Sequence, residues 1–356
     1  MEKVIRKKKV TPSKLAEQMK ERMSTPIPKK KEYDGDFTHV VSTGSTLLDL
    51  AISGGRVRGG GLPGGILVEA FGPSGSGKTV VLCQIAGGIQ RKGGATFFRD
   101  PEARLNRQFA TMFDLNVEEM EIDNPDTIPE VFEPIRKWDP APSDTLHGVF
   151  VDSLAALSTN LELDSKDGDK MGMRRAKEFS EQLRKTCRVI TEKKFLVVCS
   201  NQVRSSGDTS PYAEKTSAAG GYAIGFYAST RLKFNNPKKI KVTKTINKKE
   251  VERVVGVTTE VEVYKNSVWK PYRSAPLTII FDYGIDNIRE NIQYLKRMSG
   301  QTMYAIGDTK LGKSLEESIA IVEKEGLEKE LEQAVINLWE EVEAKFDSNR
   351  KRRIMT

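Results

Sequence analysis

The residues between Gly72 and Thr79 carry the clearest chemistry in the sequence. They fit the pattern G-x-x-x-x-G-K-T and lie between an apolar run at 65–71 and a helical pattern at 80–86, the context that a phosphate-binding loop requires. The glycines let backbone N–H groups turn inward, and the following helix directs its positive dipole end at the same point. Lys78 would then reach the β- and γ-phosphates, and Thr79 would bind Mg²⁺. The sequence therefore predicts a nucleoside triphosphate site formed by Gly72, Pro73, Ser74, Gly75, Ser76, Gly77, Lys78 and Thr79.

Polar side chains at the ends of three later strands can serve the same triphosphate. Asp152 ends the apolar strand 148–153, where a carboxylate can hold the hydration shell of Mg²⁺. Glu102 follows an earlier strand and could orient the water that attacks the terminal phosphate. A single glutamate in a loop is more often only solvated, but its place between the phosphate loop and Asp152 favours a catalytic role. Gln202 ends the last strand and could hydrogen-bond the γ-phosphate.

Alternating strand and helix patterns predict the scaffold for these groups. Four apolar, β-rich runs are separated by helical segments, at 65–71, 95–100, 148–153 and 194–202. Such alternation indicates the α/β class, with a parallel-rich sheet flanked by helices, and the polar residues then collect at the carboxyl ends of the strands. Two polar loops, at 164–172 and 203–221, leave the same edge. The second has no pattern of its own, and loops of that length are usually functional or disordered.

Length and composition allow one α/β core of ordinary size with a smaller satellite. The chain has 356 residues, of which 38% are hydrophobic and 30% charged, and no run approaches the roughly 20 apolar residues of a membrane span. Its lysine-rich start lacks the apolar stretch of a signal peptide, so we expect a cytoplasmic protein with no membrane partner. Cys83, Cys187 and Cys199 have spacings that suit neither a disulfide framework nor a zinc site, and we interpret them as buried hydrophobic residues.

Positive charge is concentrated at the two ends of the chain. Residues 1–31 hold eleven Lys and Arg against three Glu, a net charge of +8 that equals that of the whole chain. Residues 350–353 are all basic, so the body between the two ends is mildly acidic. Basic ends are usually solvated tails, but they also fit attraction to a nucleic-acid backbone without sequence readout. The sequence leaves both interpretations open.

A separate amphipathic helix is predicted at residues 11–23, where Ser13 can cap its start. A lysine-rich linker follows at 29–35, so we expect this helix to pack on a neighbouring subunit. Its apolar residues recur at helical spacing: Leu15, Ala16, Met19 and Met23.

Eight short motifs follow one another between Val41 and Asp286. They are Ser42-Thr-Gly-Ser45, Gly61-Leu-Pro-Gly64, the phosphate loop, Val151-Asp-Ser-Leu-Ala-Ala-Leu157, Asn201-Gln202, Gly220-Gly221, Phe226-Tyr-Ala-Ser-Thr-Arg-Leu232 and Tyr264-Lys-Asn266. A phosphate loop alone is shared by many unrelated ATPases, whereas this ordered series is not. Over about two thirds of its length, the chain resembles the RecA recombinases.

The resemblance implies a RecA-like core and assigns roles to single residues. Glu102 corresponds to the catalytic glutamate, Phe109 to the aromatic residue that stacks on adenine, and Gln202 to the sensor of the γ-phosphate. ATP and Mg²⁺ are the implied cofactors, and Ser153 is implied beside the metal ligands Thr79 and Asp152. The implied catalytic set is Glu102, Lys78, Gln202 and Lys265.

The two polar loops correspond to the DNA-binding loops that face the filament axis in this family. The matching ranges are 165–171 and 203–218, and Phe226 matches a position that couples subunits. The implied partners are single-stranded and double-stranded DNA, further copies of the chain in a helical filament, and single-strand-binding or mediator proteins. The implied DNA contacts are Ser165, Lys166, Lys170, Met171, Arg174, Arg175, Lys177, Arg204, Tyr212, Gly220 and Gly221.

Several positions depart from the family pattern. Of two lysines that reach across the subunit interface, Lys265 is present and the other is Ser267, for which Lys270 or a monovalent cation could substitute. Another interface lysine falls on Gly225, and the loop Met-Gly pair comes one residue early, at 171–172. These departures concern stimulation of hydrolysis by a neighbouring subunit and not ATP binding. The basic C-terminus replaces the acidic tail of many bacterial relatives, which fits a virus-encoded or otherwise divergent recombinase.

Three regions are expected. Residues 1–36 form a polymerisation helix with a basic linker, residues 37–286 the ATPase core with two DNA-binding loops, and residues 287–356 a small C-terminal α/β domain with a basic tail. One helix of the small domain has the apolar stripe Leu327, Leu331, Val335, Leu338 and Val342. Residues 235–260 predict a β-hairpin, whose lysines are either a solvated face or additional DNA contacts: Lys238, Lys239, Lys241, Lys244, Lys248 and Lys249.

Three functions are compatible with these features. The first is a DNA-dependent ATPase that forms filaments on single-stranded DNA and catalyses homologous pairing and strand exchange, in the cytosol or nucleoid or, for a viral protein, in the host cytoplasm. The second is a RecA-fold filament or regulatory protein that binds ATP with little turnover. The third is a hexameric motor of the replicative helicase type, which would need an arginine finger and a ring-forming linker. The ordered motifs favour the first.

Overall fold

A computed structural model describes residues 39–141, 145–159, 171–205, 216–218, 222–348 and 350. These residues belong to a unit that spans residues 37–356. The helix predicted at 11–23 lies outside the described residues, as does most of the basic C-terminal run. The boundaries of the three predicted regions stay a prediction.

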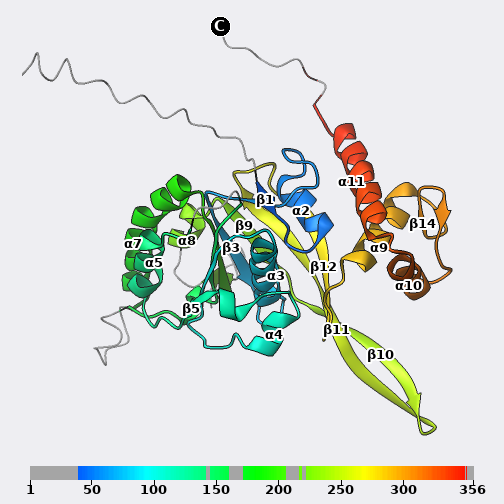
Figure 1. The fold of residues 1–356 in the computed structure, drawn as a ribbon, viewed down its shortest axis with the longest axis horizontal. Helices are drawn as coiled ribbons and strands as arrows, with labels where there is room; N and C mark the ends of the chain where they lie inside the picture. Colours follow the sequence, from blue (N-terminus) through cyan, green and yellow to red (C-terminus); the bar gives the residue numbers. More distant parts are fainter. Residues whose placement is uncertain are drawn as a thin grey trace, which may run out of the picture. The chain divides into compact units, whose positions relative to one another are not determined.

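An eleven-stranded sheet organises the described residues (Figure 1). Its strand order is β13-β12-β11-β9-β3-β7-β6-β4-β5, with β10 paired to β11 and β8 to β7. The strands from β9 to β5 run parallel, and those from β9 to β13 pair antiparallel. The strands of this sheet are β3 (Ile66–Gly72), β4 (Thr96–Arg99), β5 (Glu121–Asp123), β6 (Gly148–Val151), β7 (Leu196–Ser205), β8 (Thr216–Ala218), β9 (Thr230–Phe234), β10 (Lys238–Ile246), β11 (Lys249–Asn266), β12 (Ser274–Ile280) and β13 (Gly284–Ile285).

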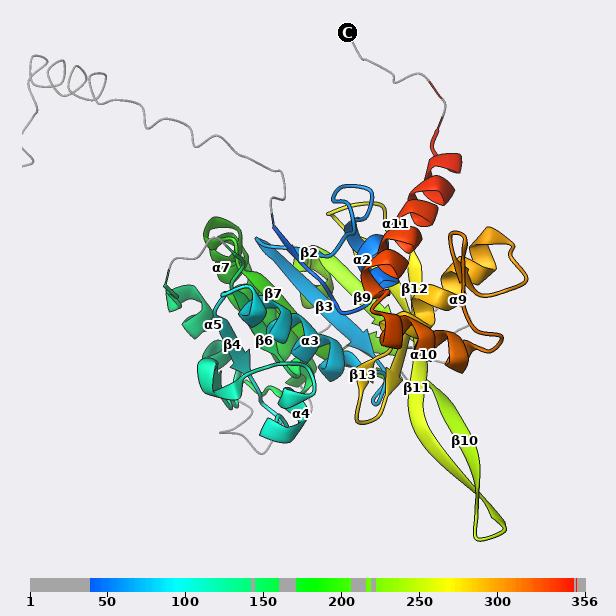
Figure 2. The same ribbon diagram turned by 45° about the vertical axis from the view of Figure 1, so that its right-hand side comes forward.

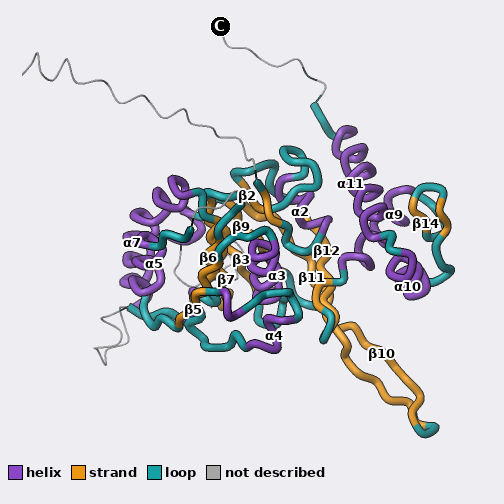
Figure 3. The backbone as a smooth tube through the Cα atoms, in the orientation of Figure 1, coloured by secondary structure: helices purple, strands orange, loops and turns teal. Residues whose placement is uncertain are grey.

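Helices cover both faces of the parallel strands (Figure 3). Alternate residues of β3 enter different cores, since Val68 packs with α2 and α3 whereas Leu67 packs with α5 and α7. This two-sided burial is why the central strands are apolar throughout, and it confirms the predicted α/β class. The helices are α2 (Thr46–Ser53), α3 (Lys78–Arg91), α4 (Arg107–Thr111), α5 (Ile128–Lys137), α7 (Met171–Lys193), α8 (Tyr222–Tyr227), α9 (Asn287–Ser299), α10 (Leu315–Glu325) and α11 (Glu328–Lys345).

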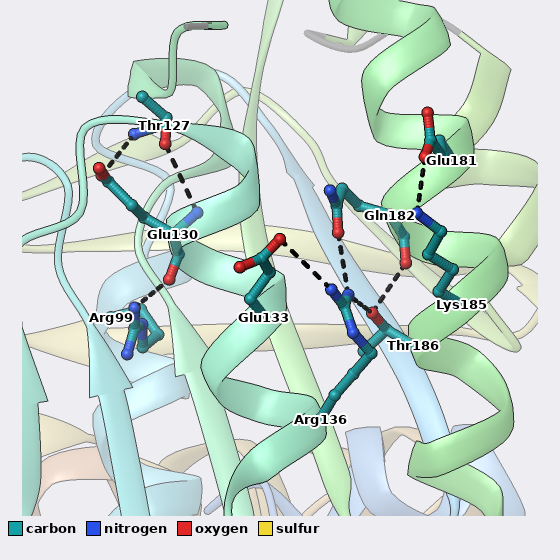
Figure 4. Close-up of polar contacts among 9 residues, drawn as sticks. All are labelled: Arg99, Thr127, Glu130, Glu133, Arg136, Glu181, Gln182, Lys185 and Thr186. Atoms are coloured by element: carbon teal, nitrogen blue, oxygen red, sulfur yellow. Dashed lines mark hydrogen bonds and ion pairs between the residues drawn. The ribbon is translucent and has the colours of Figure 1, made fainter.

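Polar contacts fix the pair of helices α5 and α7 (Figure 4). Thr127 and Glu130 form a reciprocal capping box at the start of α5, which satisfies backbone N–H groups that have no partner within the helix. From the last turn of α5, the Arg136 guanidinium donates to Gln182 Oε1 and Thr186 Oγ1 on α7, each at 2.9 Å. These contacts join α5 to α7, and α7 shares one hydrophobic core with β6 and β7.

The end of β7 differs from the sequence-based expectation. A loop without structure was predicted from residue 203, but β7 continues to Ser205 and pairs antiparallel with β8. The pairing joins Val203 to Ala218 and Ser205 to Thr216. The backbone N–H and C=O groups of β7 beyond the main sheet find hydrogen-bond partners in β8. The polar composition of this segment does not indicate such a pairing.

The C-terminal region packs on the core through α11. Leu331 and Val335 are buried, as the predicted stripe requires, and the Trp269 and Trp339 rings approach to 5.3 Å. Arg273 forms a two-point ion pair with Glu343 on this helix. The remaining short strands of the structure are β1 (Val40–Val41), β2 (Leu62–Pro63), β14 (Ala305–Ile306) and β15 (Thr309–Lys310).

Two of the three cysteines behave as the sequence predicts. Cys83 and Cys199 are free and fully buried among apolar side chains, and burial raises the pKa of both thiols. None of the helices that the structure describes combines the length and the apolar character that a bilayer crossing demands.

A buried carboxyl group in α2 makes stability depend on pH. Asp49 accepts hydrogen bonds from the Thr43 N–H at 2.8 Å and the Thr43 hydroxyl at 2.7 Å, and the Ser42 hydroxyl also donates to it. Burial nevertheless dominates and raises the pKa of Asp49 to about 7. The native state therefore binds a proton that the unfolded chain releases from about pH 4 upward.

We expect the free energy of unfolding to fall as pH rises from about 4 to 7, and to level off above the native pKa. The Asp49 contribution is at most on the order of 4 kcal/mol. Urea denaturation at several pH values would measure it in the wild type and in Asp49→Asn, which cannot ionise. The variant should lose this part of the pH dependence. Equal slopes in the two proteins would show that Asp49 titrates normally in the native state.

Candidate nucleotide site

The phosphate loop connects the carboxyl end of β3 to the start of α3. Gly77 precedes the helix with φ +96°, a conformation that favours glycine. A Cβ atom at Gly72 would lie 2.4 Å from the Phe234 carbonyl oxygen, so backbone packing against β9 also requires a glycine there. The local sequence thus produces the predicted strand, loop and helix.

Lys78 folds back onto the loop that contains it. Its ammonium group donates to the carbonyl oxygens of Gly72 at 3.0 Å and Pro73 at 2.7 Å. The side chain is buried, and burial lowers the pKa of Lys78, while the nearby Asp152 and Glu102 carboxylates oppose that change. The loop therefore concentrates a positive charge at its centre, where anionic phosphate oxygens are stabilised.

Asp152 lies next to the loop and contacts Thr79. The Thr79 hydroxyl donates to Asp152 Oδ2 at 2.6 Å, and the Ser200 hydroxyl donates to Oδ1. Burial raises the pKa of Asp152, and these two hydrogen bonds oppose the rise. A hydroxyl and a carboxylate at this distance are the oxygen ligands that Mg²⁺ takes beside phosphate, so the predicted pair of metal ligands is adjacent in space.

Glu102 lies at the centre of a second set of contacts. Its Oε1 accepts from the Ser153 hydroxyl at 2.8 Å and from Gln202 Nε2 at 3.4 Å. Its Oε2 lies 2.5 Å from Arg104, whose side chain is 74% exposed. The loop that carries Glu102 is held by Asp100, which accepts from the Leu105 N–H at 2.8 Å. The structure thus brings Glu102 and Gln202 into contact from two different strand ends.

A cavity of about 380 Å³ joins these groups. Phe109 lines one side and stacks edge to face with Phe113 at 5.2 Å, as a wall for a flat adenine ring would. The opposite wall comes from β12 and the residues after it, which sequence patterns did not reveal. The cavity residues that were not predicted are Val80, Arg104, Met112, Phe113, Ser200, Val257, Ile279, Ile280, Phe281, Asp282 and Gly284.

Lys265 is the one predicted catalytic residue that does not line this cavity. Its ammonium group donates to the Gly225 and Phe226 carbonyl oxygens, each at 2.9 Å, at the end of α8. Burial lowers the pKa of Lys265, and the Arg231 charge adds to that effect. Within a single chain, Lys265 therefore belongs to α8 and not to the nucleotide site.

Lys270, the candidate substitute for the second interface lysine, forms ion pairs within its own chain. Its ammonium group lies 3.1 Å from Asp347 and 3.9 Å from Glu343, so it pairs with the C-terminal part of its own chain. Ser267 donates to the Ser229 carbonyl oxygen at 3.1 Å. A role for Lys270 toward a neighbouring copy stays a prediction.

The structure describes only some of the residues that were predicted to contact DNA. Arg174 and Lys177 are exposed on α7, whereas the Arg175 guanidinium donates to the Ala155 carbonyl oxygen at 3.1 Å. Met171 begins α7 and Arg204 lies in β7. The others lie outside the described residues: Ser165, Lys166, Lys170, Tyr212, Gly220 and Gly221.

The comparison with protein families decides the assignment. The RecA N-terminal domain matches residues 26–286. The chain belongs to the RecA family. The protein RecA of Delftia acidovorans is 32% identical over 303 residues, which cover 83% of this chain and 78% of that protein. The protein RecA of Borrelia turicatae is 32% identical over 289 residues, 80% of this chain and 76% of its own.

One solved structure similar to this RecA-family protein is the RadB recombinase. It has a TM-score of 0.48 and 20% sequence identity, and the match covers 69% of this chain and 98% of that chain. The family assignment confirms the predicted resemblance, and RecA-family proteins act in recombination as ATPases that bind DNA. The roles of single site residues in this chain stay predictions.

Removing the Lys78 ammonium group should abolish nucleotide binding while leaving the fold intact. Lys78→Ala should weaken ATP binding by about 2–5 kcal/mol, the cost of losing a buried charged partner. Titration with a fluorescent ATP analogue measures the affinity, and circular dichroism checks the fold. Lys185→Ala, in an exposed pair with Glu181, is the matched control. Equal affinity in Lys78→Ala and the control would exclude the phosphate loop as the site.

Proposed function

We propose that this RecA-family protein is a DNA-dependent ATPase that forms helical filaments on single-stranded DNA and catalyses homologous pairing and strand exchange. The observation that supports it most is the contact between Glu102 and Gln202, at 3.4 Å. It joins the proposed catalytic carboxylate to β7, the strand that leads from the nucleotide cavity into the predicted DNA-binding loop at residues 203–218.

ATP with Mg²⁺ is the proposed ligand of the cavity. The phosphate loop and the buried Lys78 suit the triphosphate, and Phe109 suits the adenine. Thr79 Oγ1 and Asp152 Oδ2 lie 2.6 Å apart, and this hydroxyl and this carboxylate fit Mg²⁺ as ligands. When bound, the ion would supply electrostatic stabilisation of the phosphate charge.

Glu102 is the proposed acceptor for a proton of the attacking water. Its carboxylate is mostly buried at 15% exposure and is held in place by the Ser153 hydroxyl. A carboxylate fixed beside the phosphate loop can orient a water in line with the terminal phosphate. Arg104 pairs with the opposite oxygen of Glu102, which helps to fix the orientation of the carboxylate.

Gln202 is the proposed link between nucleotide and DNA. Its amide donates to Glu102, and the next residue, Val203, pairs with Ala218 on β8. A γ-phosphate that competes for the Gln202 amide would shift the end of β7 and thereby the start of the loop. Order in that loop then depends on both ligands, which is what reciprocal coupling between two sites requires.

Assembly into a filament is proposed to bring Lys265 to the cavity of a neighbouring copy. Phe226 is 76% exposed on α8, and an apolar side chain of this size in the open suits a subunit interface. The Lys265 ammonium group donates to the Phe226 carbonyl oxygen, so contact at Phe226 and release of Lys265 would be linked. The second interface position holds Ser267.

A filament protein with little ATP turnover is the second candidate. It is favoured by the replacement at Ser267 together with the engagement of Lys265 and Lys270 within their own chain. In both candidates the protein binds ATP. They differ in whether single-stranded DNA accelerates hydrolysis.

Glu102→Gln should separate hydrolysis from binding. The amide keeps the size of the side chain but cannot accept the proton, so we expect turnover to fall by about 10²–10⁴ while ATP affinity is preserved. Phosphate release with and without single-stranded DNA gives the rates. Glu118→Gln, which removes an exposed carboxylate paired with Arg107, should behave as the wild type. Near-normal turnover in Glu102→Gln would move the base elsewhere.

Gln202→Ala should uncouple the two ligands. We expect ATP affinity without DNA to change little, and most of the gain in DNA affinity that ATP confers, a coupling of roughly 1–3 kcal/mol, to be lost. Fluorescence anisotropy of labelled single-stranded DNA, with an ATP analogue and with ADP at one salt concentration, measures the ratio. Gln333→Ala, exposed on α11, is the control. If Gln202→Ala keeps the wild-type ratio, the coupling runs through the Phe226 interface instead.

A further inference from the structure

The hairpin of β10 and β11 projects from the sheet as a two-stranded ribbon (Figure 2). From Gly256 onward, β11 pairs with β12 on its other side, whereas residues 249–254 pair with β10 alone. Residues 241–250 are all exposed. A two-stranded ribbon without a covering layer is only marginally stable in water, so the length of this one needs an explanation beyond packing.

Its geometry is well defined despite the exposure. Asn247 and Lys248 have φ +49° and +62°, the left-handed pair of a tight two-residue turn, and Ile246 pairs with Lys249 across it. A register shift between Ile240 and Lys241 marks a bulge near the root, which increases the local twist. The register determines which side chains share each face of the ribbon.

The pairing separates the charges onto two different faces. One face, called the basic face below, carries four cations and no carboxylate: Lys238, Lys244, Lys249 and Arg253. The opposite face, called the mixed face, carries two cations and two carboxylates: Lys239, Lys241, Glu250 and Glu252. The structure describes every residue of the ribbon. On the mixed face, Lys241 Nζ lies 2.8 Å from Glu252 Oε1, so the charges of this face neutralise one another.

A purely solvating role explains this pattern poorly. Lysines on exposed strands often prevent edge-to-edge aggregation, but that role needs no separation of lysines from glutamates by face. The basic face also exposes aliphatic side chains between its cations, with Val242 at 37% and Ile246 at 53% exposure. Cations spaced by apolar carbons suit a ligand with phosphates around sugar and base edges.

The basic face continues at its root into a second hollow. Ile240 and Thr258, which lie on that face, line a cavity of about 310 Å³ together with residues of α9. Two arginines of α9, Arg289 and Arg297, belong to its wall. Arg289 is partly neutralised by Asp286 at 2.8 Å, while Arg297 lies over the Tyr294 ring. Arg297 thus adds a cation beside the root of the ribbon, while Glu290 of the same helix also lines the hollow.

We propose that the basic face of the β10–β11 ribbon is a binding arm for double-stranded DNA. The nine residues of β10 span about 30 Å at roughly 3.4 Å per residue, close to one turn of the double helix at about 34 Å. The major groove, about 12 Å wide, admits a two-stranded ribbon. Residues 238–258 contain no aromatic side chain, whereas proteins that hold single strands rely on aromatic stacking. The inference rests on the function proposed above, because strand exchange needs a duplex beside the filament's own strand.

Two matched double variants test the arm in the full-length protein. Lys244→Gln with Lys249→Gln removes two charges from the basic face, and Lys239→Gln with Lys241→Gln removes two from the mixed face. All four positions are exposed, so neither variant should disturb folding. Fluorescence anisotropy with a labelled duplex of about three helical turns, at several salt concentrations with the ATP analogue present, measures affinity and its salt dependence.

The basic-face variant should bind duplex DNA roughly 10- to 60-fold more weakly at 0.1 M salt, and the slope of log K against log salt should lose about 1.8, the value for two phosphate contacts. The mixed-face variant should change duplex affinity by less than about threefold. Lys244→Arg with Lys249→Arg, which keeps both charges, should bind duplex DNA as the wild type does. An equal loss of duplex affinity in both double variants would overturn the proposed DNA-binding arm. No loss in either variant would also overturn it and would favour an acidic protein surface as the partner.

ATP hydrolysis stimulated by single-stranded DNA is measured on the same samples. It should be unchanged in both double variants, because none of the four substituted side chains lines the nucleotide cavity. If the wild type shows this stimulation and the two variants have equal duplex affinities, the proposal of a DNA-binding arm is wrong and the proposed function stands. If the wild type shows no stimulation but only the basic-face variant loses duplex binding, the arm stands and the proposed function fails.

Discussion

The buried charges at the carboxyl edge of the parallel strands impose the central constraint on this structure. Lys78, Asp152 and Glu102 all lie largely out of water, and isolated charges in such surroundings are costly. Each is therefore held by hydrogen bonds: Lys78 by loop carbonyls, Asp152 by two hydroxyls, and Glu102 by Ser153, Gln202 and Arg104. These partners come from the ends of four strands, β3, β4, β6 and β7. They meet only because these strands are neighbours in the sheet.

The same constraint connects chemistry to motion. In the proposed function, a triphosphate with Mg²⁺ would offer new partners to Lys78, Thr79 and Gln202. A group that changes partner would release the partner that it has now. Gln202 matters most in this exchange because β7 continues from it into the pairing with β8. In the proposed function, a change at the γ-phosphate position would therefore reach the predicted DNA-binding loop through this one strand. Lys265 shows a similar competition, since its present partners are carbonyl oxygens of α8 beside the exposed Phe226.

Local patterns were sufficient to predict the fold class and the placing of the main site residues at the carboxyl ends of the parallel strands. The phosphate loop, the strand before it and the helix after it are set by neighbouring residues, and so is the Thr127 capping box of α5. Contacts that depend on distant segments were missed. Ser200 reaches Asp152 only because β6 and β7 are neighbours, Ile279 forms a cavity wall from the antiparallel half of the sheet, and Lys270 pairs with Asp347. These three contacts join segments that are far apart in the sequence, so the spacing of residues along the chain does not indicate them.

Electron microscopy of the full-length protein with single-stranded DNA tests the central claim most directly, because it reports ATP-dependent assembly without relying on any one residue. The protein should form continuous helical filaments on the DNA with a non-hydrolysable ATP analogue and should form few or none with ADP. Filaments of equal length with both nucleotides would contradict the coupling of the nucleotide cavity to DNA. Closed rings or isolated molecules with the ATP analogue would contradict a filament-forming recombinase altogether.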